Sequence, residues 1–339
     1  MRAFQISQFG LEHLRPVELS VPTPGPGTVL IHVHAVSLNY RDLLLVRGHY
    51  DPKLNMPRIP LSDGAGEVVA VGEGVTHWQV GDRVVGLFLQ HWQDGEPSQE
   101  KSRGALGGDV DGMIAEYVVL PEEGVVRFPA HLSYEEAATL PCAALTAWNA
   151  LMVAAAVKPG DTVVIQGTGG VSMFALQFAK LAGARVLGTS SSDKKLQRAT
   201  ELGLDAGFNY SRDAAWSKWV KQQTGGEGAD VIVEVGGSGT LGESMKAVRV
   251  GGTIAQIGVL SGTEEKLSVV PILMRQIRIL GIYVGSRTMM EAMHRAIDGS
   301  QMRPAVGKVF PFLATVTAYR HLEQGLHVGK IVISIDSES

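Results

Sequence analysis

The chain has 339 residues, of which 45% are hydrophobic and 19% charged, and its formal net charge is −4 at pH 7. This length exceeds what one hydrophobic core usually supports, so we expect two domains, and the weak negative charge argues against nucleic acid or an anionic membrane as a partner. No apolar stretch is long enough to cross a bilayer, and the first residues lack the apolar region of a signal peptide. The single cysteine, Cys142, excludes an internal disulfide and is typical of a reducing compartment, so we expect a cytoplasmic protein.

The N-terminal part of the chain has the pattern of a β domain. Short β-branched runs, separated by glycine and proline, lie at residues 28–34, 65–71, 82–88 and 115–120. Strands at this spacing, with turn residues between them, indicate a barrel-like β unit. The polar stretch at 91–112 is expected to be a long surface loop.

From residue 126 the pattern changes to alternating helices and strands. Helices are expected at 133–157, 171–182, 193–202, 212–223 and 239–248, and strands at 161–166, 184–189, 206–208, 230–235, 252–257 and 278–284. This alternation predicts a parallel, doubly wound sheet, and hence an α/β protein. The tail has one expected helix and a strand at 329–334 that we expect to return to the first domain. The predicted domains are 1–125, completed by 287–339, and 126–286.

The segment GTGGVS, residues 167–172, lies between the first strand of this sheet and the following helix. In that context Gly167 permits a tight turn, Gly169 lets backbone approach a pyrophosphate, and the small Ser172 allows close packing of helix on strand. The free N–H groups at the helix start, from Gly170 and Val171, would then face the anion. The alternative is a glycine-rich bend that binds nothing.

The end of the next strand indicates which dinucleotide binds. Where an NAD-binding protein has Asp or Glu to hold the ribose 2′-hydroxyl, this chain continues into Ser190-Ser-Ser-Asp-Lys-Lys195. Hydroxyl groups and cations favour a 2′-phosphate, so we expect NADP(H) rather than NAD(H), bound by Ser190, Lys195 and Tyr210. In an alternative interpretation, Ser192 only caps the next helix and Asp193 complements its positive end.

Several segments together resemble the medium-chain dehydrogenase/reductase superfamily, and most closely its zinc-free quinone oxidoreductase-like branch. The segments are 36–42, 47–50, 63–68, 81–85, 137–147 and the GTGGVS loop. The resemblance covers nearly the whole chain. It implies a GroES-like β-barrel catalytic domain, a Rossmann domain, an active-site cleft between them and a homodimer.

The resemblance also implies that no zinc is bound. Zinc-containing relatives have a Cys where this chain has Asn39, a Gly-His-Glu at Leu61-Ser62-Asp63, and a Cys matching Cys142. Only one of three protein ligands remains, and a catalytic zinc needs three. We therefore expect no metal, and we interpret Cys142 as a buried small apolar residue.

Roles for individual side chains are likewise implied by the resemblance. Asn39 would hold the oxygen of the acceptor, and Tyr50 would bind it or relay a proton to it. Thr146 would lie beside the nicotinamide, and backbone near Val259 and Ser286 would hold the nicotinamide end of the cofactor. Alternatively, Asn39 caps a turn and Tyr50 is only a wall of the pocket.

The expected function is that of an enzyme: a zinc-independent, NADPH-dependent oxidoreductase that transfers hydride to a small carbonyl-activated acceptor, an enone or a quinone. Conjugated acceptors need a metal least, because their developing charge is delocalised and neutral donors can stabilise it. One departure weakens the quinone assignment: Leu44 replaces a tyrosine found in some quinone reductases. The alternatives are an NADP-dependent alcohol dehydrogenase or ketone reductase, and a non-catalytic dinucleotide-binding protein.

Overall fold

In a computed structural model, which describes residues 1–264 and 266–336, the chain forms two compact units. Unit 1 contains Met1–Leu145 and the C-terminal segment that begins at Gly285, and unit 2 is Thr146–Val284. The last three residues of the range 287–339, expected to complete the first domain, lie outside the described residues. Among the described residues, no helix is long and apolar enough to cross a membrane.

The boundary between the units differs from the expected one, because residues 126–145 group with unit 1 rather than with the second domain. The helix α2 (Tyr134–Ala137), which Ser133 caps by accepting from the Glu136 N–H at 3.2 Å, packs on the β3 and β4 strands (Thr28–Leu38 and Asp63–Val71). The Ser37 hydroxyl of β3 donates to the Ala138 carbonyl at 2.9 Å. These contacts hold the segment on the unit 1 sheet.

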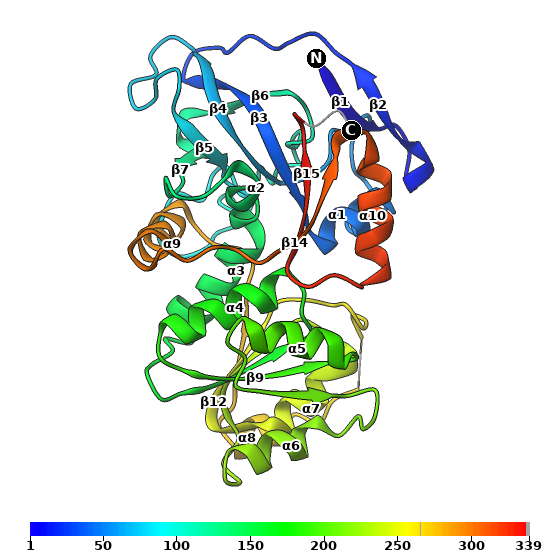
Figure 1. The fold of residues 1–339 in the computed structure, drawn as a ribbon, viewed down its shortest axis with the longest axis vertical. Coiled ribbons are helices and arrows are strands. Elements are labelled where there is room, and N and C mark those ends of the chain that lie inside the picture. Colours follow the sequence, from blue (N-terminus) through cyan, green and yellow to red (C-terminus); the bar gives the residue numbers. More distant parts are fainter. Residues whose placement is uncertain (265, 337–339) are drawn as a thin grey trace. The chain divides into compact units, whose positions relative to one another are not determined.

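Unit 1 is built on a seven-stranded sheet, and its first two strands pair in a separate two-stranded sheet. The strands are labelled in Figure 1. The path of the seven-stranded sheet is β14-β15-β3-β4-β5-β7, and β6 also pairs with β3. The expected return of the C-terminal strand is confirmed, because β15 pairs antiparallel with β3. The remaining strands of the unit are β1 (Arg2–Ile6), β2 (Leu14–Glu18), β5 (Arg83–Gly86), β6 (Tyr117–Pro121), β7 (Val125–Arg127), β14 (Val306–Pro311) and β15 (Lys330–Ser334).

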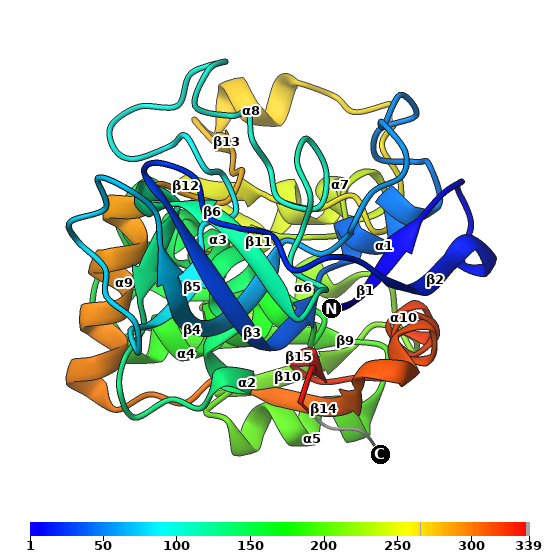
Figure 2. The same ribbon diagram turned by 90° about the horizontal axis from the view of Figure 1, so that it is seen from above.

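Several helices and strands of unit 1 were missed from the sequence: α1 (Tyr40–Val46), α10 (Thr315–Gln324), β1, β2, β7 and β14. The tail therefore has two helices, α9 (Arg287–Ser300) and α10, instead of one. Seen from above in Figure 2, α10 lies beside β14 and β15, which it contacts. Its fully buried Tyr319 and Ala318 belong to the main core of the unit. Short helices of this kind depend on tertiary packing and leave only a weak periodicity in the sequence.

Unit 2 is a parallel sheet with strand order β10-β9-β8-β11-β12-β13, which confirms the predicted doubly wound fold. Its strands are β8 (Thr162–Gln166), β9 (Arg185–Ser190), β10 (Ala206–Asn209), β11 (Ala229–Glu234), β12 (Val248–Gln256) and β13 (Arg278–Gly281). Its helices are α4 (Gly170–Leu181), α5 (Asp193–Glu201), α6 (Trp216–Gln223), α7 (Ser238–Ala247) and α8 (Val270–Met274). Figure 1 shows α4 and α5 on one face of this sheet and α6 and α7 on the other.

The helical stretch expected at 133–157 is present but irregular. After α2 it continues as a π-helical turn at Leu140–Ala144, the helix α3 (Leu145–Trp148) and a second π-helical turn at Asn149–Ala154. Such turns are rare and frequently occur at functional sites. The first of them contains Cys142.

The stretch at 91–112, expected on the surface, is a loop that is only partly exposed. Leu106 is fully buried, and Trp92 and Ala105 are nearly so. Gly107 and Gly112 pack against the backbone of Leu61, so closely that an added Cβ at Gly112 would lie 2.1 Å from the Leu61 carbonyl oxygen. The loop therefore packs against the backbone just before β4 and is not only a surface segment.

Candidate functional site

Asn39 lies between the end of β3 and the first turn of α1. Its backbone N–H donates to the Asp42 carboxylate at 2.7 Å, and Asn39 and Asp42 form a capping box at the start of α1. The carboxamide oxygen also accepts a hydrogen bond of 2.5 Å from the Lys330 ammonium, and the amide nitrogen faces the Ser62 hydroxyl at 3.5 Å. Capping of α1 alone therefore does not explain the contacts of the Asn39 side chain.

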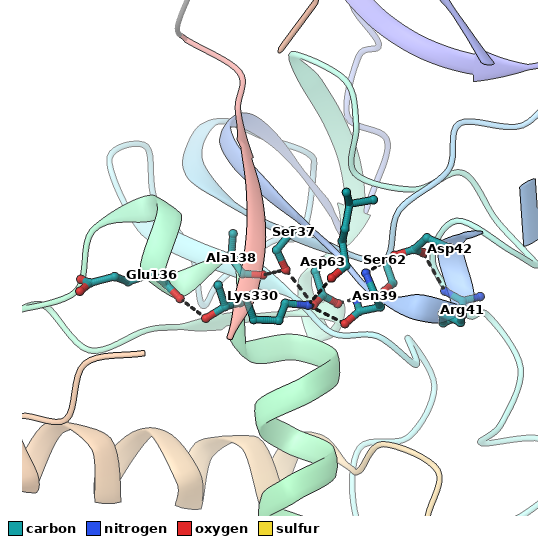
Figure 3. A network of polar contacts seen from close by, with 11 residues as sticks. Ser37, Asn39, Arg41, Asp42, Ser62, Asp63, Glu136, Ala138 and Lys330 are labelled. Carbon is teal, nitrogen blue, oxygen red and sulfur yellow. Dashed lines mark hydrogen bonds and ion pairs between the residues drawn. The ribbon is translucent and has the colours of Figure 1, made fainter. Parts of the chain in front are cut away.

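Lys330, at the start of β15, is the residue that sequence reasoning missed. Its ammonium is 2% exposed and donates to the Leu38 carbonyl at 2.8 Å, to Asn39 Oδ1, and to Asp63 Oδ2 at 3.3 Å. Figure 3 shows the side chain running from β15 to these groups. The one available signal was a lone lysine at the head of an apolar strand, Lys330–Ser334, in which every residue is buried.

Asp63 opens β4 and is completely buried. Its carboxylate accepts from the Ser37 hydroxyl at 3.2 Å and the Ser62 hydroxyl at 3.0 Å, in addition to Lys330. A buried carboxylate without such partners would be strongly destabilising. Leu61, two residues before Asp63, has a positive φ of 69°, and Gly107 and Gly112 of the 91–112 loop pack against its backbone. The backbone thus turns Ser62 and Asp63 toward Asn39.

Tyr50 lies on the same unit, next to Arg41. The Arg41 guanidinium carbon is 4.9 Å from the centre of the Tyr50 ring, and Arg41 also donates to the Leu106 carbonyl at 3.0 Å. The Tyr50 side chain is 39% exposed, so it is available to a small molecule. Asp42 pairs with Arg41 at 3.8 Å. Burial raises the pKa of the Asp42 carboxyl to about 6, although Arg41 opposes this shift.

The side chains that the family resemblance aligns with zinc ligands do not fit a zinc ion. Asn39 presents its oxygen to an ammonium, and Ser62 stands where the resemblance implies a histidine. Cys142, expected to be buried, is only half-buried. Desolvation, reinforced by the nearby Asp63, raises the pKa of its thiol well above its usual range, so the thiol stays protonated. Within residues 1–264 and 266–336, no group of three or more His, Cys, Asp or Glu side chains is placed to hold a metal.

The GTGGVS segment connects β8 to α4 in unit 2. Gly167 has a φ of 67°, so the turn itself requires glycine there. Gly169, at the N-cap of α4, has an ordinary φ of −73°, and an added Cβ would meet no protein atom within 4 Å. The protein's own packing therefore does not require glycine at Gly169, and a molecule bound against this backbone would. The N–H groups of Gly170 and Val171 lie in the first turn of α4, where helix geometry leaves them without intrahelical partners.

The strand and helix around this loop are tied together at its base. The Ser172 hydroxyl donates to the Gln166 carbonyl at 2.6 Å. The buried Gln166 amide donates in turn to the Glu234 carboxylate at 2.7 Å, and Glu234 accepts from the Gly236 N–H at 2.8 Å. This buried network, absent from the sequence interpretation, holds the ends of β8 and β11 together.

The residues expected to select NADP(H) lie at the carboxyl end of β9 and next to it. The Tyr210 N–H donates to the Ser190 carbonyl at 3.0 Å, and the half-buried Lys195 is in the first turn of α5. Burial lowers the pKa of the Lys195 ammonium. Ser192 is at the N-cap of α5 but makes no capping hydrogen bond through its side chain.

A second cation near this edge was also missed. Arg212 follows Tyr210 by two residues, is exposed, and pairs with Asp193 at the start of α5. Asp193 is further held by the Asn209 amide at 2.9 Å.

The three remaining expected residues are divided between the two units. Thr146 is buried at the start of unit 2, and Val259 is 43% exposed in the loop after β12. Ser286 belongs to unit 1, is fully buried, and caps α9 by accepting from the Met289 N–H at 3.3 Å. Its hydroxyl is thus used within the protein, so only its backbone fits the expected role.

Comparison with known proteins places both units in one family. The family model of the alcohol dehydrogenase GroES-like domain matches residues 25–130, and that of the zinc-binding dehydrogenase domain matches residues 170–299. A zinc-type alcohol dehydrogenase-like protein of Schizosaccharomyces pombe is 44% identical over 334 residues, 96% of each chain. An acryloyl-coenzyme A reductase of Metallosphaera sedula is 30% identical over 332 residues, 94% of this chain and 95% of the relative.

Two solved structures share the whole fold. An NAD-dependent alcohol dehydrogenase superposes with a TM-score of 0.91 at 37% identity, covering 99% of this chain and all of that one. The mycobacterial protein Rv1454c, solved in complex with NADPH, superposes with a TM-score of 0.84 at 27% identity and covers 99% of this chain and all of its own. With both family models matched across its length, this chain belongs to the medium-chain dehydrogenase/reductase superfamily of nicotinamide dinucleotide-dependent oxidoreductases.

Proposed function

We propose that the protein is a zinc-independent, NADPH-dependent reductase of small carbonyl-activated acceptors, enones or quinones. One observation carries the proposal: Asn39, which the family resemblance aligns with a zinc ligand, presents its carboxamide oxygen to the buried ammonium of Lys330, its amide nitrogen faces the Ser62 hydroxyl, and the Cys142 thiol stays protonated. Such a set supplies neutral hydrogen-bond donors rather than metal ligands. Donors of this kind suffice for an acceptor whose developing negative charge is delocalised by conjugation.

The first turn of α4 supports binding of the cofactor's pyrophosphate, with Gly167, Gly169, Gly170 and Val171 forming the anion site. Ser190, Lys195 and Tyr210 would hold a 2′-phosphate, and the absence of a carboxylate at the end of β9 removes the repulsion. Thr146 and the backbone at Val259 and Ser286 are assigned to the nicotinamide end. A relative solved with NADPH supports this preference, whereas a relative named as NAD-dependent argues for testing both cofactors.

The bound cofactor supplies the hydride. The part of Asn39 is to donate an amide N–H to the acceptor oxygen as charge develops on it. Tyr50 is assigned to hydrogen-bond the same oxygen through its phenol or to deliver a proton to it. The Arg41 guanidinium against its ring holds the Tyr50 side chain in place.

An acceptor conjugated to a carbonyl also agrees with one relative, because acryloyl-coenzyme A is an unsaturated thioester. The second candidate function, an alcohol dehydrogenase or ketone reductase, is favoured by the names of other relatives. The two differ in the acceptor: a simple ketone gives a localised alkoxide, for which this site offers no metal.

A homodimer is part of the proposal. The short helix α8 exposes Leu273 at 77% and Met274 at 73%, and the neighbouring Val269 is 71% exposed. This apolar patch lies next to β13, the edge strand of the unit 2 sheet. Exposed apolar side chains beside an open strand edge favour pairing with a second copy. A cytoplasmic location stays a prediction that rests on the single cysteine.

The experiment that tests the function is an assay of NADPH and NADH oxidation by protein of measured metal content. The acceptors are benzoquinone, cyclohexenone, a simple aldehyde and a simple ketone. We expect NADPH consumption with the enone or the quinone in protein free of zinc. Activity restricted to the aldehyde, the ketone or alcohols would support the second candidate. Tight NADPH binding without turnover of any acceptor would indicate a non-catalytic dinucleotide-binding protein.

A further inference from the structure

We propose that Lys330 is a positioning residue for the reaction: its buried ammonium fixes the orientation of the Asn39 carboxamide and polarises it, so that the amide N–H group is the one presented to the acceptor. This inference rests on the proposed function, because it concerns the donor that the function assigns to Asn39. Lys330 lies near the C-terminal end of the chain, 291 positions away from Asn39 in sequence.

The orientation follows from hydrogen-bond chemistry. An ammonium has three donor hydrogens and no acceptor, whereas a carboxamide has one oxygen that accepts and one nitrogen that donates. Only the oxygen of Asn39 can therefore face the Lys330 Nζ, which lies 2.5 Å from it. A flipped amide would place two donors against a buried cation.

The ammonium is held in turn by a complete set of acceptors. Its three hydrogens match three oxygens, those of Leu38, Asn39 and Asp63, and its side chain is 2% exposed. The Asp63 carboxylate balances the charge, so the pair is tolerated inside the protein. Lys330 cannot rotate away without leaving a buried charge unpaired.

The amide nitrogen on the other side of Asn39 has two hydrogens, and the structure engages at most one of them. Its contact to the Ser62 hydroxyl is long, at 3.5 Å, and Asn39 is 9% exposed. A hydrogen bond from a cation to the amide oxygen draws electron density from the nitrogen and strengthens its N–H as a donor. The charge of Lys330 thus acts on the acceptor oxygen through Asn39.

The test compares variants at both residues, with NADPH and whichever of benzoquinone and cyclohexenone the unaltered protein reduces faster. In Asn39→Asp the contact with Lys330 remains but both N–H donors are lost, so we expect kcat to fall about a hundredfold, as it does in Asn39→Ala. Lys330→Met should lower kcat about tenfold or more with an unchanged Kd for NADPH. The matched control Lys246→Met removes an exposed, paired lysine in unit 2 and should leave the rate unchanged.

Coupling separates a positioning role from a merely structural one. If Lys330 acts through Asn39, the double variant Lys330→Met/Asn39→Ala should be no slower than Asn39→Ala alone. Lys330→Met leaves the buried Asp63 carboxylate without its cation. The variant Lys330→Met/Asp63→Asn has no such unpaired charge, and it should show the same loss of kcat as Lys330→Met.

Each result decides between defined outcomes. Full activity in Lys330→Met/Asp63→Asn, with Asn39→Ala impaired, would overturn the role of Lys330 and leave the proposed function standing. Additive losses in the double variant would also overturn it, since they would show that Lys330 acts independently of Asn39. Wild-type kcat in Asn39→Ala and Asn39→Asp would remove the donor itself from the proposed function.

Discussion

The glycine loop of unit 2 and the Asn39 cluster of unit 1 are built in opposite ways. The loop is one contiguous segment of six residues, whereas the cluster joins Asn39, Asp63 and Lys330 from three distant strand ends. The loop is open toward solvent at Gly169, and the cluster is almost completely buried. The comparison teaches that the site proposed for the cofactor depends on local backbone geometry, whereas the site proposed for the chemistry depends on long-range packing.

The largest expected effect is at the glycine loop. Gly169→Asp should abolish NADPH binding, because the side chain would occupy the space of the pyrophosphate and add a repelling charge. Gly169→Ala should fold with unchanged stability, because no protein atom would contact the new methyl group. Its affinity for NADPH should nevertheless fall about tenfold or more, since the bound ligand would contact that methyl group. Affinity is measured by fluorescence titration. Gly25→Asp, at an open glycine of unit 1, is the control. Unchanged NADPH affinity in Gly169→Asp would refute the anion site.

The next largest effect is expected on kcat, at Tyr50 of unit 1. Tyr50→Phe should lower kcat about a hundredfold if the phenol delivers a proton, while the contact of the ring with Arg41 is kept. Tyr40→Phe is a closely matched control, because both tyrosines are 39% exposed. Equal rates for the two variants would show that Tyr50 is only a wall of the pocket. Steady-state kinetics at saturating NADPH measure the difference.

A smaller effect tests cofactor selection. Lys195→Ala should weaken NADPH binding about tenfold and leave NADH binding unchanged, since only NADPH carries the 2′-phosphate. The neighbouring Lys194, exposed on the same helix, provides the control variant Lys194→Ala. The variant Arg212→Ala measures whether the Arg212 guanidinium also contributes to NADPH binding. Equal losses for the two cofactors in Lys195→Ala would show that this residue does not recognise the 2′-phosphate.

The smallest expected effect is a pH-dependent change in the free energy of unfolding, caused by the buried carboxyl group of Asp42. Because burial raises the pKa of Asp42 to about 6, the folded state binds a proton more tightly than the unfolded state. Asp42 therefore lowers stability above pH 6, and this penalty is relieved as the pH falls through the folded pKa toward the unfolded one. Asp42→Asn should be more stable than the unaltered protein at about pH 7.5, with the advantage shrinking by about 1 kcal/mol by about pH 5. Denaturant unfolding at the two pH values measures it, and a pH-independent difference would contradict the shift.

The sequence predicted unit 2 well for a physical reason. Its strands and helices alternate with strong periodicity, and the turn at Gly167 depends on neighbours in the chain. The parallel, doubly wound sheet and the position of GTGGVS at the start of α4 follow from these local signals. The resemblance to a family likewise pointed to Asn39 and Tyr50, whose side chains lie in unit 1 near Asp42 and Arg41.

The Asn39 cluster could not be predicted in the same way, because its partners meet only when β15 pairs with β3. Nothing near Lys330 in sequence indicates that its ammonium meets Asn39 and Asp63. The boundary of unit 1 extends past residue 125 for a similar reason, since the Ser37–Ala138 hydrogen bond and the packing of α2 on β3 and β4 are long-range contacts. Ser286 was expected from the resemblance to contribute backbone to the cofactor site. That its hydroxyl caps α9 became visible only in the structure.

The most direct test of the central claim is the rate of enone-dependent NADPH oxidation by protein stripped of metal with a chelator, measured before and after addition of zinc. The account predicts full activity without zinc and no stimulation by it, because the cation that acts on the acceptor oxygen is the buried ammonium of Lys330. Activity that disappears with the chelator and returns with zinc would contradict the account.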